Sequence, residues 1–159
     1  MTQVLLVSAM APARPVLEAA LPTFAAAGVD VCACVNKPAY RSPYAGLPTK
    51  ELHVLSPKPW SVRPQPRWSP IRIATSLEWR VQRLRRRQAG PAVKPWLLAS
   101  RDPWFRQAVA ESQVIVAMDR LSVYTVWRAN RLKGEHRVFY GLPATLRYLQ
   151  LEPQETNRS

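Results

Sequence analysis

Residues 4–35 read VLLVSAMAPARPVLEAALPTFAAAGVDVCACV, and this stretch decides the fold class. Its first residues, Val4–Val7, form a continuous apolar run that fits a strand buried on both faces of a parallel sheet. Two prolines then suit the start of a helix, whose apolar residues recur at helical spacing until Gly28. Val29–Val35 follows as a second apolar strand. A strand, a helix and a strand in this order predict a βαβ unit with a right-handed crossover.

The rest of the chain continues this alternation. Pro22 lies inside the first predicted helix and is expected to kink or split it, because proline lacks a backbone N–H. Asn36–Lys50 contains three prolines and is predicted to be a long loop. The later elements are predicted as a strand at Leu52–Leu55, a helix from Asp102–Pro103 to about Ser112, a strand at Val114–Met118, a helix at Arg120–Lys133, a strand at His136–Tyr140 and a helix at Pro143–Leu151.

Alternating strands and helices predict an α/β fold with a single Rossmann-like open parallel sheet of about five strands. A length of 159 residues is typical of one domain, which we place at residues 1–151, and a polar tail follows at 152–159. Between the third strand and the helix that begins near Asp102, we expect a helical insert at 57–101 that is basic and rich in proline and tryptophan.

This insert carries most of the net charge of the chain, which is +13 from 23 Lys and Arg and 10 Asp and Glu. From Lys58 to Arg101 there are eleven basic residues and one acidic residue, Glu78, so the stretch supplies 11 − 1 = +10. Four of the six tryptophans lie in it, and Trp104 stands just past its end. Such a charge indicates an anionic partner and bears on association rather than on the fold.

Within the insert, residues 70–88 predict a basic amphipathic helix with four apolar residues on one face. The candidate anion- or partner-binding residues are Arg72, Arg80, Arg83, Arg85, Arg86, Arg87 and Trp79. Docking on an anionic membrane surface, contact with a nucleic-acid backbone and contact with a protein partner all fit this pattern. The amphipathic helix favours lipid over nucleic acid, and a solvated or intramolecular helix face is the structural alternative.

The sequence also disfavours several classes of function. The first strand is followed by Ser8–Ala13, which contains no glycine, so the dinucleotide-binding motif G-x-G-x-x-G is missing. No Walker A loop is present, and we expect no cofactor and no metal. Cys32 and Cys34 lack partner ligands for a zinc site and are expected in the core. Without a basic secretory segment or an apolar run of spanning length, we expect a cytoplasmic protein, with peripheral attachment as the form that a membrane association would take.

Ligands of open parallel sheets bind beyond the carboxyl ends of the strands. There the sequence places Asp119 as the candidate catalytic residue, and Ser8, Ser122 and Tyr140 line the predicted crevice. The Asp119 carboxylate could orient a hydroxyl or act as a general base, but its position before a helix also predicts an N-cap. For the two histidines, His53 and His136, a structural or surface role is favoured over that of a base, because no motif surrounds them.

Residues 112–127 read SQVIVAMDRLSVYTVW, and this strand-to-helix turn resembles a late turn in the N-terminal half of bacterial GT-B glycosyltransferases. The opening strand, helix and strand are similar too, so the resemblance covers residues 1–35 and about 103–151. It implies an acceptor-side Rossmann-like domain whose nucleotide-sugar is held by a second domain. Because the length accommodates one domain, the expected partner is a separate donor-binding subunit of a split transferase. The alternative is a non-catalytic adaptor or scaffold protein that binds a protein, anionic lipid or nucleic acid through residues 63–101.

Overall fold

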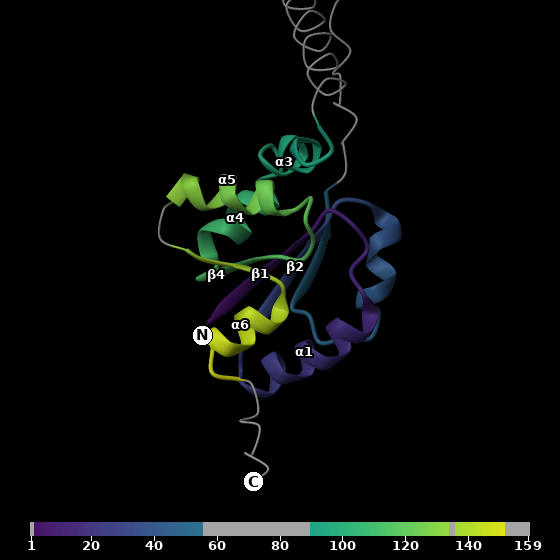
Figure 1. Ribbon diagram of the computed structural model, residues 1–159, viewed down its shortest axis with the longest axis vertical. Coiled ribbons are helices and arrows are strands. Elements are labelled where there is room, and N and C mark those ends of the chain that lie inside the picture. Colours follow the sequence, from purple (N-terminus) through teal and green to yellow (C-terminus); the bar gives the residue numbers. More distant parts are fainter. Residues whose placement is uncertain (1, 56–89, 134–135, 152–159) are drawn as a thin grey trace, which may run out of the picture.

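The structure is a computed structural model that describes residues 2–55, 90–133 and 136–151. Five parallel strands form one sheet in the order β3-β2-β1-β4-β5 (Figure 1). The strands are β1 (Gln3–Ser8), β2 (Asp30–Val35), β3 (Glu51–Val54), β4 (Val114–Ala117) and β5 (Arg137–Tyr140). The helices are α1 (Arg14–Ala26), the 3-10 helix η1 (Pro38–Tyr44), α3 (Val93–Ala99), α4 (Pro103–Glu111), α5 (Val123–Lys133) and α6 (Leu142–Tyr148). The predicted α/β Rossmann-like fold is confirmed.

The centre of the sheet is β1, which pairs with β2 on one side and with β4 on the other. Leu5 lies opposite Cys32 in one pairing and opposite Ile115 in the other. The chain therefore builds the sheet outward from β1 in one direction, then returns to build it in the other. This reversal lies between β1 and β4, and in open α/β sheets ligands bind beyond the carboxyl ends of the strands at such a point.

Two apolar layers cover the two faces of the sheet. In β1, Val4 and Leu6 pack with α1 and α6, whereas Leu5 and Val7 pack with α3, α4 and α5. Figure 1 shows the same division, with α1 and α6 below the sheet and the other three helices above it. Every residue of β1 is buried, which confirms the predicted doubly covered strand.

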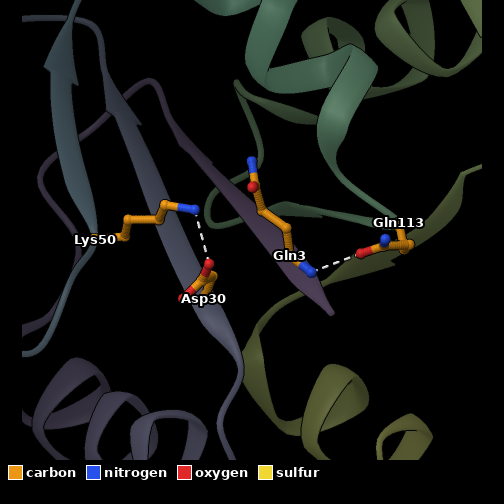
Figure 2. Close-up of polar contacts among 4 residues, drawn as sticks. All are labelled: Gln3, Asp30, Lys50 and Gln113. Carbon is orange, nitrogen blue, oxygen red and sulfur yellow. Dashed lines mark hydrogen bonds and ion pairs between the residues drawn. The ribbon is translucent and has the colours of Figure 1, made fainter. Parts of the chain in front are cut away.

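Two side-chain contacts join the amino edge of the sheet (Figure 2). The Gln3 backbone N–H donates to Gln113 Oε1 at 2.6 Å and so ties β1 to the residue before β4. The Lys50 ammonium lies 2.7 Å from Asp30 Oδ2 and links the start of β2 to the residue before β3. Because these contacts lie where the strands begin, they help set the register and leave the opposite, carboxyl edge to the candidate site.

Helix α1 runs unbroken from Arg14 to Ala26, so the predicted splitting at Pro22 is wrong. Pro22 removes the N–H that would bond the carbonyl of Glu18, and both residues are on the exposed side of the helix. Water can satisfy that carbonyl there, while Leu21 and Phe24 are fully buried and hold the helix on the sheet. Tertiary packing therefore overrides the local preference of proline.

Other boundaries differ from the prediction by a turn or less. The predicted loop Asn36–Lys50 contains η1, which is anchored by the buried Tyr44. Helix α5 begins at Val123 instead of Arg120, and α6 ends at Tyr148 instead of Leu151. The first difference has a clear cause, because residues 119–122 form a separate hydrogen-bonded turn.

Helix α3 lies at the end of the predicted basic insert, and its buried side belongs to the core. Trp96 and Ala99 pack in the same apolar layer as Phe105 of α4 and Val126 of α5. Trp96 is therefore a core side chain of the α/β fold, although the sequence prediction places it in the tryptophan-rich insert. The predicted helix at 70–88, its residues Arg72, Arg80, Arg83, Arg85, Arg86, Arg87 and Trp79, and the tail at 152–159 lie outside the described residues.

Among the helices of the described ranges, none has the length and apolar character that crossing a membrane would require.

Candidate ligand site at the carboxyl edge of the sheet

The topology brings the predicted site residues to one edge of the sheet. Ser8 is the last residue of β1, Asp119 follows β4, and Tyr140 is the last residue of β5. Ser122 stands in the turn between Asp119 and α5. All four residues lie at or just beyond the carboxyl ends of neighbouring parallel strands.

The Asp119 side chain joins two of these turns. Its Oδ2 accepts the backbone N–H groups of Ala9 at 2.7 Å and Met10 at 3.0 Å, which belong to the turn after β1. Its Oδ1 accepts the N–H groups of Leu121 and Ser122, both at 2.9 Å, in its own turn. A carboxylate offers about four acceptor positions, so these four bonds use its capacity. Asp119 therefore holds the two turns together across the point where the strand order reverses.

The bonds to Ala9 and Met10 have a chemical consequence for ligand choice. In dinucleotide-binding Rossmann domains, the N–H groups at the first turn and the start of the following helix hold the pyrophosphate. Here two N–H groups of the corresponding turn bond a carboxylate of the chain itself. The Asp119 carboxylate therefore occupies two N–H groups of the turn that binds the pyrophosphate in dinucleotide-binding Rossmann domains.

Ser122 forms a reciprocal pair with Asp119. Its hydroxyl donates to the Asp119 carbonyl at 2.7 Å and accepts the Asp119 N–H at 3.2 Å. The Ser122 carbonyl accepts the N–H of Val126 at 3.0 Å, so Ser122 stands at the N-cap of α5. The predicted N-cap at Asp119 is therefore wrong: Asp119 accepts the Leu121 and Ser122 N–H groups of the turn before α5, and the helix itself begins after Ser122. Ser122 is fully buried, and its hydroxyl serves the backbone.

The Ser8 hydroxyl is also engaged inside the protein. It lies 3.0 Å from the Tyr44 hydroxyl, and both side chains are buried. Burial raises the pKa of Tyr44 to about 12, and the hydrogen bond with Ser8 offsets part of this rise. This pair fastens η1 to the end of β1.

Tyr140 is the predicted lining residue that faces solvent, with 62% of its surface exposed. Met10, in the turn after β1, is half-exposed. Asn36 follows β2 at the same edge, and its side-chain oxygen is buried without a hydrogen-bond partner in the described ranges. The carboxyl edge therefore combines an Asp119 carboxylate whose oxygens are already hydrogen-bonded to backbone N–H groups with the exposed ring of Tyr140.

A second polar pair stands near this edge and was not predicted. His53 Nε2 lies 2.9 Å from Asp102 Oδ2, and the His53 ring stacks on Trp104 with centroids 4.5 Å apart and an angle of 13°. The second carboxylate oxygen, Oδ1, accepts the Phe105 N–H at 3.1 Å and caps α4. The side chains of His53 and Asp102 are 27% and 15% exposed.

The cap at Asp102 was predicted from the Asp–Pro pair, but its histidine partner was not. His53 and Asp102 are 49 residues apart, so no local motif joins them. The usable signals in the sequence are a histidine two residues before the end of the predicted strand Leu52–Leu55 and an aspartate at a helix start at the same edge. The pair orients an imidazole in the manner that proton-transfer sites use.

The two cysteines and His136 make contacts that stabilise the fold. Cys32 and Cys34 are buried free thiols, which confirms the predicted core position, and burial raises the pKa of both. His136 Nδ1 lies 2.8 Å from the Ser112 carbonyl, and the two groups join the starts of β5 and β4. Across the described ranges, no three His, Cys, Asp or Glu side chains come together in a way that could hold a metal.

The strand order and the turns at its carboxyl edge define an α/β, Rossmann-like protein with a carboxylate at the position of the phosphate-binding turn. No protein-family model matches the chain, and no curated protein and no solved structure matches it either.

Proposed function

We propose that this chain is the acceptor-side unit of a split GT-B-type glycosyltransferase that acts at a membrane face. It binds an uncharged, hydroxylated acceptor at the carboxyl edge of its sheet, while a separate donor-binding chain holds the nucleotide-sugar. The observation that carries the proposal is the Asp119 carboxylate on the Ala9 and Met10 N–H groups.

That contact supports the assignment of acceptor binding to this chain and of nucleotide-sugar binding to a separate chain. A carboxylate at the first turn repels the phosphates of a nucleotide-sugar and occupies the N–H groups that would bind them. A neutral sugar or alcohol meets no such repulsion. The exposed Tyr140 ring at the same edge offers a flat apolar surface and a hydroxyl, which suit the faces and edges of a sugar.

Binding to the full chain tests the proposal directly. We expect simple glycosides, measured by calorimetry, to bind the wild type and to lose at least tenfold in affinity in Tyr140→Ala. Tyr148→Ala is the matched control, because Tyr148 is also about half-exposed but lies on α6. Uridine diphosphate should not bind. Affinity for this nucleotide, or an absence of glycoside binding, would contradict the proposal.

A transfer assay then tests the split arrangement. Sugar transfer from a nucleotide-sugar to the bound glycoside should require a second, donor-binding chain supplied from the native host. Transfer by the single chain would show that it holds the donor itself. The Tyr140→Ala variant should reduce transfer in the reconstituted pair, whereas Tyr148→Ala should not.

The second candidate is the non-catalytic adaptor. It is favoured by the state of Asp119, the residue predicted for chemistry, because its carboxylate already accepts four backbone hydrogen bonds. In this case the basic stretch 63–101 would recruit the partner. Replacing Arg80, Arg83, Arg86 and Arg87 by Glu should then abolish co-purification with that partner and leave the thermal unfolding midpoint of the domain unchanged.

A further inference from the structure

Helix α5 presents aromatic and basic side chains to solvent. At about 100° of rotation per residue, five of its side chains fall on the side opposite the buried Thr125, Val126 and Ala129. We call these five side chains the α5 outer face: Val123, Tyr124, Trp127, Arg128 and Arg131. Tyr124 is the half-buried member and also packs against the apolar layer under α5. Val123 and Trp127 are 43% and 48% exposed, which is unusual for two apolar residues one turn apart.

The members of the α5 outer face contact one another in a row. The Tyr124 and Trp127 rings lie 5.9 Å apart, and the Arg131 guanidinium stands 4.8 Å from the centre of the Trp127 ring. The Arg128 guanidinium lies 5.5 Å from the ring of Trp96, which extends the row to α3. The aromatic rings therefore hold the two arginines at the surface.

The positive charge of this face has no ion-pair partner among the residues that the structure describes. Helix α5 contains no Asp or Glu, and none of the ion pairs within the described ranges includes Arg128 or Arg131. Arg120, which is exposed in the turn before the helix, adds a third cation at one end. An exposed apolar pair beside cations that form no ion pair within the described ranges is complementary to a surface that is both apolar and negatively charged.

We propose that the α5 outer face is the surface by which this protein docks on an anionic lipid bilayer. The inference rests on the membrane-face part of the proposed function and assigns it to residues outside the basic segment 63–101. Trp127 and Val123 enter the boundary between head groups and acyl chains, where an indole ring is favourably placed. Arg128 and Arg131 contact the phosphates beside them.

The exposed apolar pair Val123 and Trp127 favours a lipid bilayer over a nucleic acid as the anionic partner. A nucleic acid could stack a base on Trp127, but it offers no hydrocarbon to Val123. A bilayer satisfies both apolar side chains and the arginines at once. The two contributions also respond differently to salt, because salt screens the arginine contacts and leaves apolar insertion nearly unchanged.

Vesicle co-sedimentation of the full chain tests the proposal. One set of vesicles contains phosphatidylcholine alone, and the other also contains about 30% phosphatidylglycerol, which makes its surface anionic. The first variant is Arg128→Gln with Arg131→Gln, and the second is Val123→Gln with Trp127→Gln. The matched controls are Arg41→Gln with Arg147→Gln, and Val16→Gln. These control residues lie on η1, α6 and α1, on the other side of the sheet, and Val16 is 44% exposed.

At low salt we expect the arginine variant to bind anionic vesicles about 10- to 30-fold more weakly, from roughly a factor of five for each arginine. The apolar variant should lose the binding that persists at high salt. Both control variants should bind like the wild type, and thermal unfolding should confirm that every variant is folded.

The outcomes separate the inference from the proposed function. A wild-type chain that binds no anionic vesicle would overturn the membrane-face location as well as the inference. Vesicle binding that is unchanged in both α5 variants would overturn the inference alone and assign docking to another part of the chain. Binding of single-stranded RNA that competes with vesicles and depends on Trp127 but not on Val123 would identify a nucleic-acid surface instead.

Discussion

His53 and Asp102 form a 2.9 Å contact that joins β3 to the first turn of α4. The aspartate uses its other oxygen to cap the helix, so one side chain serves two partners. Replacing Asp102 by Ser keeps a capping oxygen and removes the contact with His53. In a double-mutant cycle with His53→Phe, which keeps a ring against Trp104 and removes the ring nitrogens, we expect a coupling free energy of about 0.5–1.5 kcal/mol, measured by urea unfolding. Additive effects of the two substitutions would show that the contact contributes nothing to stability.

Loss of the Asp119 carboxylate should destabilise the domain. Asp119→Ala leaves the N–H groups of Ala9, Met10 and Leu121 without their acceptor, whereas the Ser122 N–H keeps the Asp119 carbonyl, and we expect a loss of about 2–4 kcal/mol. Asp119→Asn keeps one acceptor oxygen and should fall between the wild type and the alanine variant. Urea unfolding measures both. Glu18→Gln, at an exposed ion pair on α1, is the control and should change the unfolding midpoint far less.

The same substitution should also change which ligands are accepted. Without the carboxylate, the Ala9 and Met10 N–H groups become available to an external anion. We therefore expect phosphate at millimolar concentration to raise the thermal unfolding midpoint of Asp119→Ala more than that of the wild type. Glu111→Gln removes one negative charge elsewhere and controls for the change in net charge. An equal response of all three proteins to phosphate would show that the turn has no anion-binding capacity.

The raised pKa of Tyr44 leads us to expect a loss of folding stability at alkaline pH. Its pKa is raised to about 12 in the folded protein, compared with about 10 when exposed, so folding favours the neutral phenol. The stabilisation is complete below about pH 10 and is lost as the pH rises toward 12, at about 1.4 kcal/mol per pH unit. Tyr44→Phe should flatten the dependence of unfolding free energy on pH in this window. Tyr148→Phe, on the exposed α6 surface, should leave the slope unchanged.

Trp96 tests whether α3 is part of the core. Its side chain is 9% exposed and packs with Phe105 and Val126. We expect Trp96→Ala to cost about 3–5 kcal/mol, because it removes a large buried ring. Trp127→Ala removes the same ring from a half-exposed position and should cost much less. Similar losses for both variants in urea unfolding would contradict the burial difference between them.

The sequence predicts the sheet well because its strands carry local signals. Val4–Val7 is apolar throughout, and a buried parallel strand requires that pattern, so β1 could be assigned without knowing its neighbours. Helix α3 carries no such signal. Its short sequence, with Lys94 and Pro95 beside Trp96, is similar in composition to the basic stretch before it, and its burial depends on contact with α5.

The polar contacts at the edge could be predicted only in part. Asp119 was correctly placed at the carboxyl edge, since a charged residue directly after a buried strand must lie there. Its bond to the Ala9 N–H spans 110 positions and depends on β1 and β4 being neighbours. The engagement of the Ser8 and Ser122 hydroxyls inside the protein likewise depends on where η1 and the turn at 119–122 pack.

The central position of β1 has a consequence for folding during synthesis. Its pairing with β2 closes within the first 35 residues, but its other edge pairs with β4, which begins at Val114. Contacts between such distant segments form late and at a larger entropic cost than local ones. Until the ribosome has released β4, the emerging chain carries an unpaired apolar strand edge, the kind of surface that aggregates or recruits chaperones. The contact between Gln3 and Gln113 joins the two distant segments whose pairing covers that edge.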